Sequence, residues 1–314
     1  IYEANGNIVE SIDKSVSLLV NGNSYLPNDS DLLGKSVAFF NLSEIKDAIG
    51  IETYNFQLVL PDSLKIIEDS AFSGCDGITS LVIPDGVKNI GDESFFNCEK
   101  LKTAPALPNS IINLRYSFYG CKSMTQAPVL PQNVFNTTYT FGHCEALKIA
   151  PEIPNQVTDM TGMFIYCTSL EKITAIPSSV TTIASAFSNC SALKDISNIS
   201  IPISVTDATS AFQSCRELTI PPDLITAVNL KNMDRMFASC ENLTTAPFIP
   251  NSVENMSSAF YKCYALTGTI TINANLTQYD SCFAGTQKEI ILNGTSQQLN
   301  ELVNTSHKYN ISVK

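Results

Sequence analysis

A phenylalanine recurs every 23 residues through most of this chain, and a cysteine follows it three positions later. The step widens to 25 residues twice, from Cys190 to Cys215 and from Cys215 to Cys240. Self-similarity at such a period marks a stacked-repeat architecture, in which each copy packs only on its neighbours. The ladder positions are Phe72, Phe95, Phe118, Phe141, Phe164, Phe187, Phe212, Phe237, Phe260 and Phe283, with Cys75, Cys98, Cys121, Cys144, Cys167, Cys190, Cys215, Cys240 and Cys263.

The tenth copy keeps the phenylalanine and loses the cysteine. Thr286 stands three residues after Phe283, where the other copies carry a cysteine. Cys282 lies one residue before Phe283, at a position that holds Ala71 or Ala186 in other copies. Cys282 is therefore the one cysteine outside the ladder.

Each copy also carries an aliphatic residue three positions after its cysteine and then a turn containing proline, such as Pro84-Asp85-Gly86. Proline presets φ, and Asn or Asp bonds its own backbone, so these turns reverse the chain. The segment Ile78–Ile83 predicts a strand, and Val87–Cys98 predicts the return along the opposite wall. Stacked copies would then share one core and form a parallel sheet. Its strands should be very short where a proline removes an N–H from the ladder, at Pro105, Pro128, Pro151 and Pro247.

The run Leu81-Val82-Ile83-Pro84-Asp85-Gly86-Val87-Lys88-Asn89-Ile90-Gly91, followed by Phe95 and Cys98, resembles the BspA-type leucine-rich repeat of bacterial surface proteins. Later copies, such as Val157–Phe164 and Asn232–Phe237, drift toward a Met-Phe variant. The resemblance implies a leucine-rich-repeat solenoid of about ten stacked repeats of 23–25 residues. It also implies a parallel β-sheet on one face and short turns or helical segments on the other, with non-repeat caps at both ends.

The repeats span residues 58–292, which predicts an N-terminal cap at 1–57 and a C-terminal cap at 293–314. In the first cap a helix is expected over Ser43–Ile49, because Ser43 suits the N-cap and Gly50 ends the periodic residues. In the second, Thr295 and Gln298 have capping-box spacing before Leu299 and Leu302, and Tyr309–Val313 reads as a strand.

The charge balance bounds the partners. Thirty acidic against 19 basic residues give a net charge of −11, which repels nucleic acid and anionic lipid. No run approaches the roughly 18 apolar residues that cross a bilayer, so membrane insertion is not expected. The start at Ile1 without methionine fits an exported, mature form, although a cleaved tag would look the same. An extracellular or cell-surface location is expected, with the export signal absent from this chain.

The nine ladder cysteines are expected to be free core thiols. Copies stack about 4.8 Å apart, whereas a disulfide needs Cβ atoms about 3.8 Å apart. A linear ladder without a C-x-x-C pair also does not converge on zinc. His143 beside Cys144 invites a Cys–His nucleophile, but position 143 varies freely between copies, and Cys144 points inward with its equivalents. We therefore expect no enzyme, cofactor or metal site, and keep a hydrolase as a distant alternative.

The resemblance implies a binding or adhesion scaffold for a host protein, cell-surface or glycan ligand, and a monomer is expected. A structural spacer that presents another domain is the alternative. A ligand site is also predicted where the period breaks, because the inserted residues near Asp195–Ser200 and Pro221–Ala227 should form loops that bulge together, and neutral drift in a tolerant turn is the alternative. The candidate ligand-binding residues are Val82, Gln126, Ile149, Lys172, Asp195 and Phe248.

Overall fold

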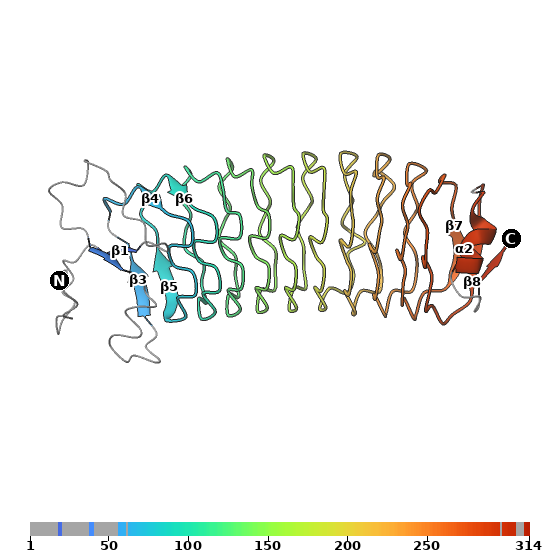
Figure 1. Cartoon of the computed structure of the whole chain (residues 1–314), viewed down its shortest axis with the longest axis horizontal. Coiled ribbons are helices and arrows are strands. Elements are labelled where there is room, and N and C mark those ends of the chain that lie inside the picture. The colour runs from blue at the N-terminus through green and yellow to red at the C-terminus, as the bar shows by residue number, and fades with distance from the viewer. Residues whose placement is uncertain (1–17, 21–37, 41–55, 61, 296, 306–310) are drawn as a thin grey trace.

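The computed structural model describes residues 18–20, 38–40, 56–60, 62–295, 297–305 and 311–314. The repeats stack side by side in an elongated column, with β5 near one end and β7, β8 and α2 near the other (Figure 1). The predicted helix at Ser43–Ile49 and most of the predicted N-terminal cap lie outside the described residues.

All strand pairs in the described residues are parallel, and all the strands are short. At the N-terminal end β1 (Leu18–Val20) pairs with β2 (Ala38–Phe40), and β3 (Phe56–Val59) pairs with β5 (Ile78–Val82). The two-residue strands β4 (Ile66–Ile67) and β6 (Asn89–Ile90) pair on another side of the column.

The C-terminal end has its own three-stranded sheet. Here β8 (Ile290–Asn293) lies between β7 (Gly268–Thr271) and β9 (Ile311–Val313). The helix α2 (Leu299–Thr305) buries Leu299 and Leu302. These apolar residues, which follow the predicted capping box, therefore face the protein interior. Thr295 itself bonds to Asn273 through its N–H (2.9 Å) and its hydroxyl (3.2 Å).

Between β6 and β7 the predicted sheet is reduced to isolated parallel bridges, such as Thr103↔Gln126 and Ile149↔Lys172. The prolines explain the interruption, since Pro128 and Pro151 follow the bridge residues closely and have no N–H to donate. We call the position five residues after each ladder cysteine the strand wall. In the middle copies it holds Thr103, Gln126, Ile149, Lys172, Asp195 and Ile220.

The opposite side, which we call the turn wall, runs from two residues before each ladder phenylalanine to the position three residues after it, such as Glu93–Cys98. Alternate amides there donate to the next copy: Glu93 to the Arg115 carbonyl (3.1 Å), Phe95 to Ser117 (2.9 Å) and Asn97 to Tyr119 (2.7 Å). The intervening amides of Phe96 and Cys98 bond back three residues within their own copy. Because the amides of this segment are paired, the backbone can lie against a packed core without unsatisfied donors.

Two residues of every copy have a left-handed backbone, at the positions two before and two after the ladder phenylalanine. In the Phe141 copy they are Tyr139, with φ of 56°, and His143, with φ of 56°. None of these positions carries a β-branched side chain, which is the kind least tolerated at positive φ. The full set is Ser70, Gly74, Glu93, Asn97, Tyr116, Gly120, Tyr139, His143, Gly162, Tyr166, Ser185, Asn189, Ser210, Ser214, Arg235, Ser239, Ser258, Lys262, Ser281 and Gly285.

The core is a continuous stack of the ten ladder phenylalanine rings. Neighbouring ring centroids lie 5.3 Å apart at Phe72–Phe95 and 5.9 Å apart at Phe118–Phe141, with interplanar angles of 0° and 6°. Every ring in the stack is buried. This packing is why the phenylalanine recurs without a gap, since a smaller side chain would leave a cavity between two copies.

Candidate binding surface

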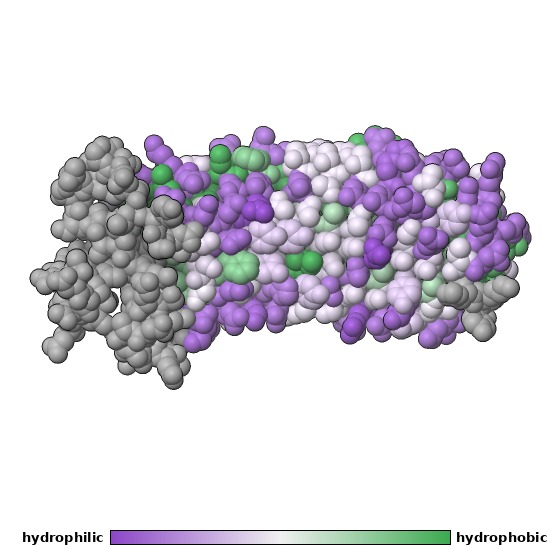
Figure 2. Space-filling view, viewed as in Figure 1, coloured by the Kyte–Doolittle hydropathy of each residue, from purple (hydrophilic) through white to green (hydrophobic). Residues whose placement is uncertain are grey.

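The strand wall brings four of the six predicted ligand residues into one exposed row. Gln126, Ile149, Lys172 and Asp195 stand at equivalent positions, and the Ile149 side chain is 56% exposed. Gln126 and Ile149 line one open groove together with Thr125, Ala127, Lys148, Ala150 and Pro151. On the face shown in Figure 2, hydrophobic side chains form small separate patches on a mostly polar surface.

The other two predicted residues lie outside this row. Val82 stands seven residues after Cys75, and Phe248 stands eight residues after Cys240, whereas the row lies five residues after its cysteines. Both side chains are exposed. Each is therefore a separate surface position, and the six residues do not form a single site.

The ladder cysteines are buried free thiols, and each one from Cys98 to Cys263 donates to the carbonyl of the phenylalanine in the preceding copy. The Cys144 Sγ lies 3.2 Å from the Phe118 carbonyl oxygen. Burial raises the pKa of Cys144 well above its ordinary value and that of Cys263 to about 12. A thiol held neutral in this way is a poor nucleophile. Sequence reasoning identified the burial and missed the hydrogen bond.

His143 packs against its neighbours, although the residue type at its position varies from copy to copy. Its ring stacks on Tyr166 with centroids 4.4 Å apart and leans on Tyr119 at 5.1 Å. Its left-handed backbone restricts the side chains that this position tolerates. Burial lowers the pKa of His143 below its ordinary value. The second histidine, His307, lies outside the described residues.

The His143 ring belongs to an aromatic cluster on the turn wall. Phe96 stacks on Tyr119 at 5.0 Å, Tyr116 stacks on Tyr139 at 4.7 Å, and the Arg115 guanidinium lies 5.0 Å from the Tyr116 centroid. A Cβ at Gly142 would collide with the Tyr119 ring, and one at Gly162 would collide with the Tyr139 ring. The rings cover one another's faces, and the backbones of Gly142 and Gly162 lie against them. The cluster therefore packs neighbouring copies together.

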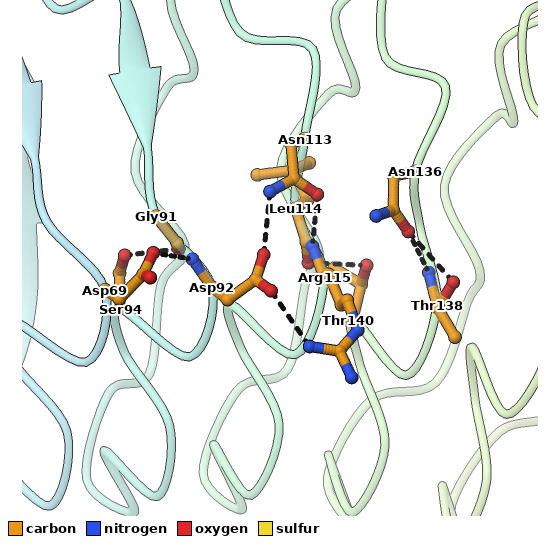
Figure 3. A network of polar contacts seen from close by, with 10 residues as sticks. All are labelled: Asp69, Gly91, Asp92, Ser94, Asn113, Leu114, Arg115, Asn136, Thr138 and Thr140. Carbon is orange, nitrogen blue, oxygen red and sulfur yellow. Dashed lines mark hydrogen bonds and ion pairs between the residues drawn. The ribbon is translucent and has the colours of Figure 1, made fainter.

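A row of polar residues also pairs copy to copy beside the turn wall (Figure 3). Asp92 accepts bonds from Asn113 Nδ2 (2.7 Å) and from the Arg115 guanidinium (2.9 Å). Asn136 Oδ1 accepts from the Thr138 N–H (3.3 Å) and hydroxyl (2.9 Å). Asn136 therefore caps a turn amide of its own copy, whereas Asp92 holds two side chains of the next copy. In the part of the chain that the structure describes, no group of three or more His, Cys, Asp or Glu residues is placed to hold a metal ion.

Comparison with known families decides the identity of these repeats. Residues 51–162 and 115–221 match the BspA type leucine rich repeat region, in six copies, and together they cover more than half of the 314 residues. The chain belongs to the BspA-type leucine-rich repeat family. A second family, described as Mycoplasma protein of unknown function, DUF285, matches residues 181–293 and so takes in the Met-Phe copy at Phe237. A comparison with curated proteins finds no match.

Three bacterial proteins of solved structure are similar to this chain at low identity. A leucine rich cell surface protein from Faecalibacterium prausnitzii A2-165 is 22% identical over 83% of this chain and 88% of its own, with a TM-score of 0.39. A leucine-rich repeat protein from Bacteroides ovatus ATCC 8483 is 20% identical over 82% and 92%, with a TM-score of 0.36. Pneumococcal vaccine antigen PcpA is 17% identical over 84% and 80%, with a TM-score of 0.47. At these identities the likeness concerns the fold alone.

The two 25-residue copies of this BspA-type array are packed more tightly than predicted. The inserted segments add one turn to each copy, closed by the Ile199 N–H to the Ile196 carbonyl (2.9 Å) and by Ala227 to Leu224 (3.0 Å). The two segments also bridge each other at Ser200↔Asp223. Ile196, Ile199 and Leu224 are buried. The two segments are turns that meet, as expected, but they do not only bulge outward, because each also carries aliphatic side chains that fill the core.

No helix in the described residues is both long and apolar enough to cross a membrane.

Proposed function

We propose that this chain is a non-enzymatic scaffold on the bacterial surface that binds a protein ligand along its strand wall. The observation that carries the proposal is the contrast between a uniform interior and a varied exposed row. Phenylalanine fills every core rung, whereas Gln126, Ile149, Lys172 and Asp195 follow one another at equivalent exposed positions. A packed core restricts its residues, but an outward position can change without cost to the fold.

The composition of the row favours a protein ligand. It combines an exposed aliphatic side chain at Ile149 with both charge signs, at Lys172 and Asp195. The open groove between Gln126 and Ile149 adds a concave surface for an apolar anchor residue. Protein interfaces typically surround such an anchor with polar and charged groups.

The titratable residues favour binding over catalysis. The thiols beside the core are held neutral by burial, and the pKa of His143 is lowered within an aromatic stack. A catalytic acid or base instead needs a pKa near the working pH and access to a substrate. We also propose that residues 1–57 and 293–314 act as caps, that the scaffold is a monomer, and that it lies outside the cell.

The test is a binding screen of the whole chain against immobilised extracellular-matrix proteins, cell-surface proteins and glycans. We expect a protein ligand, and we expect the double variant I149D/K172E to weaken its binding at least about tenfold, because both changes sit in the row. The matched control is Lys262→Glu, which changes a charge on the turn wall.

Equal loss in the Lys262→Glu control would move the site away from the strand wall. Binding of glycans alone would contradict a protein ligand. If nothing binds, the array is a spacer that presents another domain, because its column of repeats would then serve only to set a distance.

A further inference from the structure

In two adjacent copies, the tip of the turn that precedes the turn wall carries an aliphatic residue, where other copies carry a polar one. In these copies the tip carries Ile203, which is 55% exposed, and Val228, which is 52% exposed. A turn tip ordinarily carries Asn, Asp, Ser or Gly, because it is fully hydrated and those side chains bond the local backbone. Seven other copies follow that rule with exposed polar side chains, at Asp62, Asp85, Asn109, Gln132, Asn155, Ser178 and Asn251.

The two aliphatic tips are neighbours. Asn229 Nδ2, next to Val228, donates to the Ile203 carbonyl at 3.1 Å. A third aliphatic side chain, Ile225, stands at the tip of the inserted turn three residues before Val228 and is 63% exposed. We call Ile203, Ile225 and Val228 the apolar tips. A lone exposed aliphatic residue is ordinary, but three on adjacent turns at the only two period breaks are not.

The apolar tips stand on an ordered support. The Thr226 hydroxyl donates to the Ile201 carbonyl (2.8 Å) and lies 2.8 Å from the Ser200 hydroxyl across the two copies. The Ser200↔Asp223 bridge joins the same two segments. Presenting apolar side chains on turns that are already held by hydrogen bonds lowers the entropy lost when a partner binds.

The inserted segments carry negative charge. Asp223 accepts the Ile225 N–H at 2.8 Å, and Asp195 accepts the Ser197 N–H at 3.0 Å. Among the described residues neither carboxylate has an ion-pair partner, whereas the nearby Lys231 is paired with Glu254 at 2.6 Å. The inserted segments therefore combine aliphatic tips with two carboxylates that no cation neutralises.

We propose that the apolar tips form a second docking surface, for a protein segment that carries aliphatic or aromatic side chains flanked by Lys or Arg. Its apolar side chains would cover Ile203, Ile225 and Val228, and its basic residues would pair with Asp223. The carboxylates and the net charge of −11 disfavour an anionic lipid surface and a second copy of this chain. This surface rests on the proposed binding function and names the chemistry of one partner.

The test selects peptides from a random 12-residue display library on the whole chain. The comparison protein is the double variant I203N/V228N. Asparagine occupies the equivalent tip at Asn109, Asn155 and Asn251, so the variant should keep its fold, which circular dichroism checks. We expect a class of selected peptides rich in Lys or Arg and in large apolar residues. These peptides should bind I203N/V228N at least about tenfold more weakly than the wild-type chain.

Two control variants distinguish non-specific hydrophobic binding from specific recognition. Adding N155I/S178I to the I203N/V228N variant moves two aliphatic tips to adjacent 23-residue copies, without the inserted turns, and should not restore binding of the basic peptides. The variant Asp223→Asn keeps the apolar tips and should weaken the same peptides while leaving binding to the strand wall unchanged.

The outcomes distinguish this surface from the strand wall. If only I149D/K172E loses binding of the selected peptides, the docking surface at the apolar tips is contradicted and the proposed binding function of the strand wall is supported. Acidic peptides, or equal binding to I203N/V228N, would also overturn the tips. A concentration-dependent dimer or binding to phosphatidylglycerol vesicles, abolished by I203N/V228N, would show that the occupant is a second copy or a membrane instead. If no peptide is selected by either surface, both proposals fail.

Discussion

The turn wall and the strand wall are two sides of the same repeats, but their hydrogen bonding differs. The turn wall repeats the same hydrogen bonds from copy to copy, whereas the strand wall does not. On the turn wall each copy donates three backbone hydrogen bonds to the next, as Glu93, Phe95 and Asn97 do. On the strand wall of the middle copies the ladder shrinks to single bridges such as Ile149↔Lys172. The ring stack and the thiol ladder adjoin the turn wall, whereas the strand wall presents exposed side chains.

The difference teaches where this array can vary. A residue on the turn wall must fit against the copies on both sides and against the buried core. At two positions per copy it must also tolerate a left-handed backbone. A residue on the strand wall must satisfy only the solvent and its bridge partner. Stability should therefore respond to the first wall and binding to the second. Four measurements test this division, in order of decreasing effect.

The largest effect should come from ionising the thiols beside the turn wall. Burial raises the pKa of the ladder cysteines from Cys98 to Cys263 and of Cys282, while the ordinary thiol value of 9.0 applies after unfolding. The unfolded chain therefore binds fewer protons above pH 9, so the full stability is present below that pH and is lost as the pH rises toward the folded pKa values. Each thiol costs about 1.4 kcal/mol one pH unit above its unfolded pKa.

Because the buried thiols all shift in the same direction, their losses of stability add above pH 9. We expect cooperative alkaline unfolding, measured by circular dichroism against pH. C121A/C144A should flatten the slope by about two protons. Iodoacetamide at pH 8 should label no ladder cysteine in the folded chain, and all nine after denaturation without reductant. A chain that remains folded at pH 11, or two thiols protected after denaturation, would contradict this description.

Phe164→Ala should have the next largest effect. It removes a fully buried ring that stacks on Phe141 at 5.7 Å and on Phe187 at 5.6 Å, and should cost about 3–5 kcal/mol of the free energy of unfolding. Ile149→Ala on the strand wall is the matched control and should change stability by less than about 0.5 kcal/mol. If urea unfolding shows that both variants lose the same free energy of unfolding, the two walls contribute equally to stability.

A valine at a left-handed position should cost less. Ser210 has a φ of 54°, and Ser210→Val should lose about 1–2 kcal/mol, because the two methyl groups of a β-branched side chain crowd a left-handed backbone more than a serine hydroxyl does. Ser210→Gly should be close to neutral, and Lys172→Val on the strand wall should not lower stability. If Ser210→Val unfolds at the same urea concentration as wild type, the left-handed backbone does not restrict the turn wall.

The smallest effect on stability should accompany a change on the strand wall that alters binding. Ile149→Asn leaves the core untouched, so its free energy of unfolding should stay within about 0.5 kcal/mol of wild type. Affinity for any protein ligand found in the screen should still fall, because Ile149 lines the groove. Retained affinity together with retained stability would show that the groove takes no part in binding.

Sequence and structure agree most closely where spacing alone carries the information. The phenylalanine step predicts the ring stack, and the prolines near the strand wall predict its short bridges. The candidate row was found only in part, because Gln126, Ile149, Lys172 and Asp195 share a position and Val82 and Phe248 do not. Counting five residues from each cysteine would have removed those two residues.

Other features left a fainter trace in the sequence. The left-handed positions are marked only by the absence of Val, Ile and Thr two residues before and after each ladder phenylalanine. The thiol hydrogen bonds leave no trace beyond the recurrence of cysteine, because a buried cysteine also serves as a small apolar residue.

The sequence by itself determined the period, the buried rungs, the family and the acidic exterior, because these depend on which residues recur and how far apart they stand. Only the tertiary structure decided that the inserted segments fill the core, that His143 is held between two tyrosine rings, and that the turns of Ile203 and Val228 lie side by side. These contacts join residues about one repeat apart. They are set by the rotation and register of one copy on the next, which no spacing within a single copy specifies.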